Sequence, residues 1–144
     1  MEASAPPAPP TRFPASSEPA PMTPARRLVI TLPLPRKALS PNARGHWSSK
    51  ARAVKAYRTL AWAESLAHDP APRWARATAQ ASFFFMDARS RDGDNLLASL
   101  KSAFDGLADA GIVANDSGIT HLPPKLGTDK ARPRVEIEIW ETAP

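Results

Sequence analysis

The chain has 144 residues, of which 42% are hydrophobic, and a formal net charge of +5 at pH 7. This length fits one domain, and the hydrophobic fraction allows a core. The chain contains no cysteine, which excludes disulfides and thiolate metal sites and favours an intracellular protein. No apolar run approaches the roughly 18 residues of a membrane span, and the N-terminus lacks the apolar region of a secretory signal. We therefore expect a cytoplasmic protein that does not insert into membranes.

Proline and alanine dominate residues 1–25, which hold eight of the 17 prolines in the chain. Proline cannot donate to backbone ladders, and such a composition buries too little apolar surface to fold. We therefore predict a disordered tail at residues 1–25, followed by a single domain at residues 26–142.

Charge is distributed unevenly along this domain. Nine Lys and Arg residues fall between Arg26 and Arg58 without an intervening acid, whereas aspartates outnumber basic residues between Asp87 and Asp116. A basic region beside an acidic one suits a polyanion held near a metal ion. A solvated basic helix face explains the charge pattern equally well.

Apolar periodicity predicts secondary structure in the order β-α-β-α-β-β. The clearest strand is the last, where Val135, Ile137 and Ile139 alternate with glutamates. The expected elements are a strand at 28–32, a helix capped by Ser48 or Ser49 and running to about Ala67, a strand at 77–86, a helix from the N-cap Asp94 to the C-terminal stop Gly111, and strands at 119–122 and 134–140. This order predicts a small α+β domain with a mixed or antiparallel sheet, preferably mixed, and helices packed on one face.

The most informative stretch begins with Asp92 and Asp94, one residue apart at the start of the second predicted helix. Lys101 follows Asp94 by about 700° of helical rotation and so falls on the same side. Asp116 comes after the helix, in a second turn. Carboxylates that converge from separated points, with a cation close by, suit a Mg²⁺ site that acts on phosphodiesters.

Structural roles compete with this interpretation. Helix capping and favourable interaction with the helix dipole account for at least one of the two neighbouring acids. Lys101 can form a plain salt bridge with Asp105, one turn later. Gly106 costs about 1 kcal/mol relative to alanine inside a helix, which predicts close packing against another element there. We expect a structural role for His121.

Three consecutive motifs, supported by a weaker N-terminal one, resemble a known family. They are Arg91-Asp92-Gly93-Asp94-Asn95-Leu96, Lys101-Ser102-Ala103-Phe104-Asp105-Gly106-Leu107, Asp109-Ala110-Gly111-Ile112-Val113-Ala114-Asn115-Asp116 and, more weakly, Leu32-Pro33-Leu34-Pro35 with Ser40-Pro41-Asn42, Arg44 and His46-Trp47. Together they are similar to the RusA family of Holliday-junction resolvases, which is widespread in phages and prophages. The resemblance extends over about residues 27–141, nearly all of the chain outside the proline-rich tail.

This resemblance implies a small α+β homodimer that cuts four-way DNA junctions symmetrically with Mg²⁺. Mn²⁺ stays open as an alternative metal. The resemblance also implies that Asp92, Asp94 and Asp116 hold the metal and that Lys101 is the active-site lysine. The lysine is assigned by counting back from the motif that begins at Phe104. Counting forward from Asp94 reaches Ala98 instead, so the chain carries about one additional helical turn between the acids and the lysine.

The sequence therefore predicts a Mg²⁺-dependent, structure-selective endodeoxyribonuclease that resolves junctions in recombination and repair, in the cytoplasm and associated with the nucleoid. The residues expected to contact DNA are Asn42, Arg44, His46, Lys50, Lys55 and Arg58. Two alternatives stay open: a branched-DNA-binding dimer without catalysis, and a metal-dependent nuclease with another nucleic-acid substrate.

Overall fold

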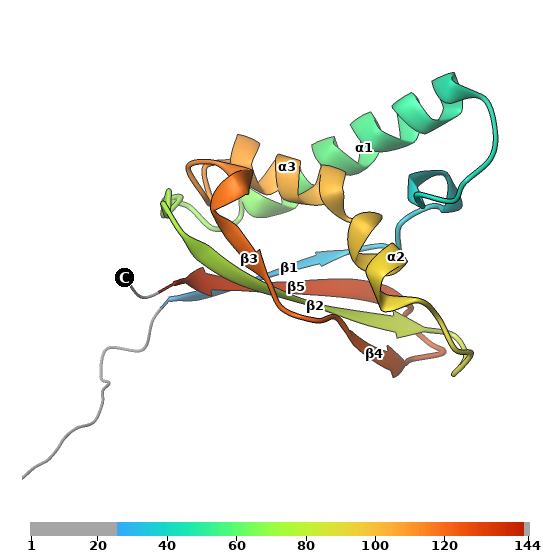
Figure 1. The fold of residues 1–144 in the computed structure, drawn as a ribbon. Helices are drawn as coiled ribbons and strands as arrows, with labels where there is room; N and C mark the ends of the chain where they lie inside the picture. The colour runs from blue at the N-terminus through green and yellow to red at the C-terminus, as the bar shows by residue number, and fades with distance from the viewer. Residues whose placement is uncertain (1–25, 143–144) are drawn as a thin grey trace, which may run out of the picture.

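A computed structural model describes residues 26–142, so the segment 1–25, for which we predicted disorder, lies outside the described residues. The described chain forms a five-stranded sheet with its helices gathered on one face (Figure 1). The elements are β1 (Arg27–Leu32), the 3₁₀ turn η1 (Lys37–Leu39), α1 (Trp47–Ser65), β2 (Ala77–Phe85), α2 (Gly93–Ala98), α3 (Lys101–Asp109), the 3₁₀ turn η2 (Asp116–Gly118), β3 (Ile119–His121), β4 (Lys125–Thr128) and β5 (Arg134–Glu141). The predicted α+β class is confirmed.

The sheet is mixed, as predicted. β5 lies between β1 and β2 and is antiparallel to both. On the other edge of β2, β3 and β4 follow one another and are both parallel to it (Figure 1). β3 matches the strand predicted at 119–122, whereas β4 was not predicted, because its short Lys-Leu-Gly-Thr sequence has no apolar alternation. This topology brings η2, just before β3, into contact with α3.

Alternating side chains of the three long strands, β1, β5 and β2, form one side of the core. Leu28, Ile30 and Leu32 of β1 are buried opposite the buried valine and isoleucines of β5. On β2 the alternation buries alanines and then Phe83. Because side chains alternate across a strand, one face of the sheet is apolar and receives the helices. The predicted strands at 28–32, 77–86 and 134–140 are therefore confirmed to within a residue or so at each end.

α1 buries a single stripe at four-residue spacing, formed by Ala53, Tyr57, Ala61 and Ser65. The hydroxyl of Tyr57 donates to the carbonyl of Pro33 at 2.7 Å, which ties α1 to the end of β1. The predicted cap was wrong: His46 precedes the helix, and its Nδ1 accepts from the backbone N–H of Ser48. No helix in residues 26–142 combines the length and apolarity needed to cross a membrane.

The helix predicted from Asp94 to Gly111 is two helices, so this prediction was wrong. α2 ends at Ala98 and α3 begins at Lys101. Between them, the Ser99 hydroxyl donates to the Leu96 carbonyl at 2.6 Å, a local bond that competes with helical pairing. Leu100 at the junction is fully buried. The break falls within the additional turn inferred from the sequence, and it removes the continuous rotation from Asp94 to Lys101.

α1 and α3 pack directly against one another, and Gly106 makes this contact possible. A Cβ at this position would lie 2.3 Å from the carbonyl oxygen of Arg58 and 2.9 Å from the Cβ of Ala61. Only glycine allows the two backbones to approach so closely. The close packing predicted at Gly106 is confirmed.

Candidate functional site

A pocket of about 350 Å³ lies where α2, α3, η2 and β3 meet. Asp94 comes from the first turn of α2, Lys101 from the start of α3 and Asp116 from the start of η2. Phe104 and His121 form part of the pocket lining, with their rings edge to face at 4.5 Å between centroids. Three successive elements, α2, α3 and η2, thus place two carboxylates and one ammonium group around a single cavity.

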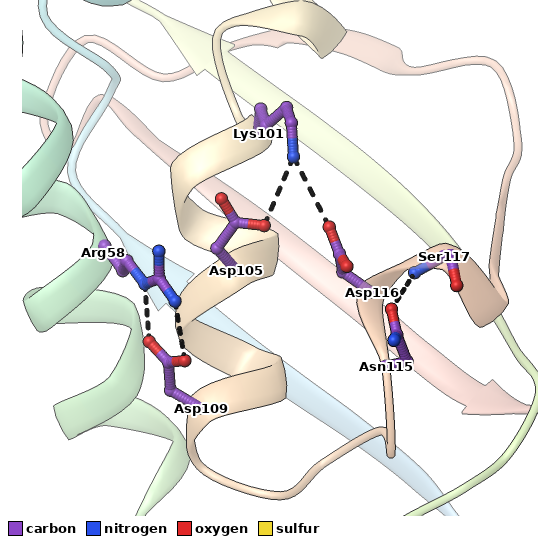
Figure 2. A network of polar contacts seen from close by, with 7 residues as sticks. All are labelled: Arg58, Lys101, Asp105, Asp109, Asn115, Asp116 and Ser117. Atoms are coloured by element: carbon purple, nitrogen blue, oxygen red, sulfur yellow. Dashed lines mark hydrogen bonds and ion pairs between the residues drawn. The ribbon is translucent and has the colours of Figure 1, made fainter.

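Lys101 bridges two carboxylates. Its Nζ lies 3.3 Å from Oδ1 of Asp105 and 3.4 Å from Oδ2 of Asp116 (Figure 2). The hydrogen bond and charge of Asp105, followed by those of Asp116, raise the pKa of the Lys101 ammonium above its ordinary value. The lysine side chain is still 73% exposed. The salt bridge to Asp105 considered for Lys101 is therefore present, and it coexists with a contact to one of the predicted metal ligands.

Asp116 is oriented by its own short turn. Asn115 caps η2, with its side-chain oxygen accepting from the Ser117 N–H at 2.9 Å (Figure 2). Hydrogen bonding with the Asp105 carboxyl, and then with Lys101, lowers the pKa of Asp116 below its ordinary value of 3.8. Asp116 is therefore an ionised carboxylate at neutral pH, with the Lys101 ammonium as its nearest positive charge. Asp105, which we had treated only as a salt-bridge partner, belongs to this cluster.

Asp92 has a different role from Asp94. Asp92, not Asp94, is the N-cap of α2, which corrects the predicted assignment. Its Oδ1 accepts from the backbone N–H groups of Asp94 at 2.9 Å and Asn95 at 3.3 Å. The physical reason is that Asp92 has extended backbone geometry, as a cap residue needs, whereas Asp94 is already helical. Of the two neighbouring acids, Asp94 is the one that lines the pocket.

No three His, Asp or Glu side chains within residues 26–142 are placed as one metal-binding group. Of the four residues predicted to be catalytic, three line a common pocket, namely Asp94, Lys101 and Asp116. Asp92 lies two residues away along the chain, with its carboxylate directed at the first turn of α2.

The residues predicted to bind DNA lie in two different environments. Arg44, Lys50 and Lys55 are exposed and form no ion pair with another described residue. Asn42 and His46 are also exposed, although one ring nitrogen of His46 caps α1. The two lysines therefore present positive charge on the exposed surface of α1, unpaired among residues 26–142, and the arginine extends this charge onto the loop before the helix.

Arg58 differs from the other residues predicted to bind DNA because it is paired with an aspartate. Its Nε and one terminal nitrogen donate to the two carboxylate oxygens of Asp109 at 2.6 and 2.8 Å (Figure 2). This pairing raises the pKa of Arg58 and lowers that of Asp109. The ion pair also offsets the unfavourable interaction between the Asp109 carboxylate and the dipole at the C-terminal end of α3.

Trp47 belongs to the weaker N-terminal motif of the family resemblance, but the sequence assigned it no role; it is the most exposed of the large hydrophobic residues described, at 76%. The sequence pattern that could have indicated a role for Trp47 is its position within a segment that contains many basic residues and no acidic one. His121, expected to be structural, lines the pocket, and burial lowers the pKa of its imidazole.

A protein described as uncharacterized, from Xylella fastidiosa (strain Temecula1), is 40% identical to this chain over 87 residues. The match covers 56% of this chain and 56% of the relative, so the chain spans about half the length of that protein. No protein-family model matches the sequence.

Proposed function

We propose that this protein is a Mg²⁺-dependent, structure-selective endonuclease that resolves four-way DNA junctions as a homodimer. The observation that carries the proposal is the pocket in which Asp94 and Asp116 face Lys101. Its supports are the exposed basic residues of α1 and the loop before it, together with the RusA-like motifs that run through the acidic segment. The mixed α+β sheet is compatible with this assignment.

The residues present fit a magnesium ion. Mg²⁺ commonly binds through one or two protein carboxylates and retains several water molecules and substrate phosphate oxygens. Asp94 and Asp116 are hard oxygen donors that line one cavity. Asp92, at the start of the same helix, is the third ligand implied by the family resemblance, and it would have to give up part of its capping interaction to bind directly. When bound, the metal lowers the pKa of a water molecule and stabilises negative charge on the phosphate.

Lys101 supplies a positive charge at the same cavity. In the resting structure it is divided between Asp105 and Asp116 at distances above 3.2 Å, so neither contact is at optimal length. A phosphate that enters the pocket offers anionic oxygens to the same ammonium. Lys101 then donates to the scissile phosphate as its charge develops, while Asp105 keeps the lysine protonated.

The basic residues position the substrate. Arg44, Lys50 and Lys55 contact phosphates without reading sequence, which makes binding strongly dependent on salt. A four-way junction has strands related by two-fold symmetry, and a two-fold homodimer presents one pocket to each of two opposing strands. Paired cuts at symmetric positions follow from this geometry.

The decisive experiment incubates the protein with a synthetic four-way junction, a matched duplex and a single strand, each in Mg²⁺ or EDTA. Paired symmetric nicks on the junction, dependent on Mg²⁺, are expected. Junction binding that is indifferent to Mg²⁺, without scission, would instead identify a non-catalytic branched-DNA-binding dimer. Cutting of the single strand or of an RNA in preference to the junction would identify a nuclease with another substrate.

Asp94→Asn tests the metal site itself. Because an amide oxygen is a weaker, neutral ligand, this variant is expected to abolish cleavage and to leave junction binding in EDTA largely intact. The matched control is Glu64→Gln, which removes an exposed acid on the outside of α1. Cleavage by Asp94→Asn at the control's rate in Mg²⁺ would exclude this pocket as the metal site.

A further inference from the structure

Trp47 exposes far more apolar surface than its environment explains. Its side chain is 76% exposed, whereas Trp74 is 8% and Trp62 41% exposed. Trp140 is covered by the guanidinium of Arg27, 4.2 Å from the ring centroid. Tryptophan carries the largest apolar surface of any side chain, and leaving it in water is unfavourable. An indole left open in this way is available to a partner.

The indole is also held in a defined place. Trp47 is the first residue of α1, directly after the cap residue His46. The His46 ring lies 5.4 Å from the Trp47 ring, with an angle of 31° between the two planes. The Nδ1 of His46 is engaged by Ser48, which orients the imidazole. Trp47 therefore sits at the fixed end of a helix, beside a second aromatic ring.

The charge around Trp47 indicates the chemistry of its partner. A pocket of about 250 Å³ is formed by Trp47, Arg44, Lys50 and small neighbours, with no acid among its lining residues. A planar aromatic surface beside cations that form no ion pair with a described residue matches a nucleotide, which combines a flat base with an anionic phosphate.

The position of this pocket relative to the acidic one provides a second argument. Lys50 also lines a neighbouring pocket of about 350 Å³, with Leu39 and Val54 among its apolar residues. This middle pocket is also lined by Asp105 and by Lys101, and it shares Lys101 with the acidic pocket. Three hollows thus follow one another from Trp47 to Asp116, joined by two lysines. A strand with its phosphate at Lys101 can therefore extend toward Trp47 along neighbouring pockets in which Asp105, already paired with Lys101, is the one acid among the residues lining the middle and Trp47 pockets.

We propose that Trp47 is a stacking platform for an unpaired nucleobase of the bound strand, with Arg44 and Lys50 neutralising the adjacent phosphates. Base–aromatic stacking is insensitive to sequence because every base has a flat face. Bases of a fully paired duplex are stacked on one another and cannot reach the indole, whereas a branch point or a single strand supplies free ones. Trp47 thus favours open over fully paired DNA. Only the role of this stacking at the branch point rests on the proposed function.

The test measures binding without metal, so that it does not depend on nuclease activity. Fluorescence anisotropy in EDTA compares an oligothymidylate of about twelve nucleotides, a four-way junction and a duplex. Trp47→Ala is expected to weaken binding of the oligothymidylate about tenfold or more and to leave duplex binding nearly unchanged. Trp47→Phe, which keeps a smaller aromatic face, retains most of the affinity. Trp62→Ala, at the other exposed tryptophan of α1, is the matched control and binds like the wild type.

Tryptophan fluorescence provides an independent readout. Stacking on a base quenches indole emission, so oligothymidylate is expected to quench the wild type and Trp62→Phe, but not Trp47→Phe. Equal affinities of wild type and Trp47→Ala for the oligothymidylate would overturn the inference. So would a loss of self-association in Trp47→Ala at unchanged affinity per subunit, which would assign the indole to a protein interface. A wild type that binds open strands through Trp47 but cuts nothing would refute the nuclease while leaving this inference intact.

Discussion

Two cations on neighbouring helices face aspartates of α3, and they do so in contrasting ways (Figure 2). Arg58 of α1 forms two short bonds, of 2.6 and 2.8 Å, with a single partner, Asp109. Lys101 forms two long contacts, of 3.3 and 3.4 Å, with the two partners Asp105 and Asp116. The first pair joins two helices, whereas the second lies over an open pocket.

The difference suits Arg58 to a structural role and Lys101 to the phosphate-binding role that we propose for it. A guanidinium bound to both oxygens of one carboxylate is fixed in orientation, and it holds α1 against α3 where Gly106 brings the backbones together. An ammonium is a point charge that can exchange partners without loss of geometry. Lys101 is therefore suited to leave its aspartates for a phosphate, and Arg58 is suited to stay where it is.

The largest expected effect follows from removing the ammonium group of Lys101. Lys101→Met should lower the cleavage rate by about 10²–10³-fold, the range typical of losing one charge-stabilising donor. Its melting temperature should change little, because exposed ion pairs contribute little to stability. Junction-cleavage kinetics and thermal unfolding of the same samples make the measurement, with exposed Lys130→Met as control. Normal cleavage by Lys101→Met would remove Lys101 from the mechanism.

The contact between α1 and α3, which the Arg58–Asp109 pair supports, is disrupted most severely by a substitution at Gly106. Gly106→Ala places a methyl group 2.3 Å from the Arg58 carbonyl oxygen, so α1 and α3 must separate. We expect destabilisation of about 2 kcal/mol, even though alanine itself favours the helix by about 1 kcal/mol. Urea unfolding provides the measurement. The control is Gly93→Ala, whose new Cβ meets Pro124 at an ordinary 3.4 Å; equal stability of the two variants would contradict the close packing.

Salt dependence distinguishes a paired cation from an unpaired one. Lys50→Met should reduce the slope of log affinity against log salt by about 1, because a phosphate contact is lost. Arg58→Met should leave that slope unchanged and lower the melting temperature, because Asp109 loses its partner. Junction binding in EDTA at several salt concentrations gives both slopes. A reduced slope for Arg58→Met would mean that Arg58 leaves Asp109 to bind phosphate, as the sequence suggested.

The smallest expected effect is on the stability of the folded protein at acidic pH. Hydrogen bonds from Arg58 lower the pKa of Asp109, and hydrogen bonding with Asp105 and then Lys101 lowers that of Asp116, both from an ordinary 3.8. A lowered pKa means that the folded state favours the ionised form. The resulting stabilisation is complete above the ordinary pKa of 3.8 and disappears as pH falls through the lowered pKa values of the folded state. The urea midpoint should therefore begin to fall below about pH 4. In Asp109→Asn the fall should be shallower; an unchanged acid profile would contradict the contribution of Asp109.

Local patterns were sufficient for much of this protein. Alternation identified the three long strands, because a strand with one buried face repeats every two residues. Apolar spacing placed α1 to within about two residues at each end. The same reasoning missed β4, which has no buried stripe, and it joined α2 to α3, because Leu96, Leu100 and Phe104 keep helical spacing across the break. It also took serines as the cap of α1, although His46 has the acceptor and the extended backbone.

The amino-acid sequence by itself determined which groups are available: a basic region, a tryptophan within it, and an acidic segment with one lysine. Only the tertiary structure decided which of them meet. Asp94 and Asp116 reach the same pocket because β3 runs beside β2 and brings η2 against α3, whereas Asp92 is retained by the first turn of α2. Arg58 forms an ion pair with Asp109, which lies 51 residues away along the chain, and its charge is therefore neutralised within the basic surface. Such pairings depend on how helices pack on the sheet, and periodicity within one segment carries no information about the distance to another.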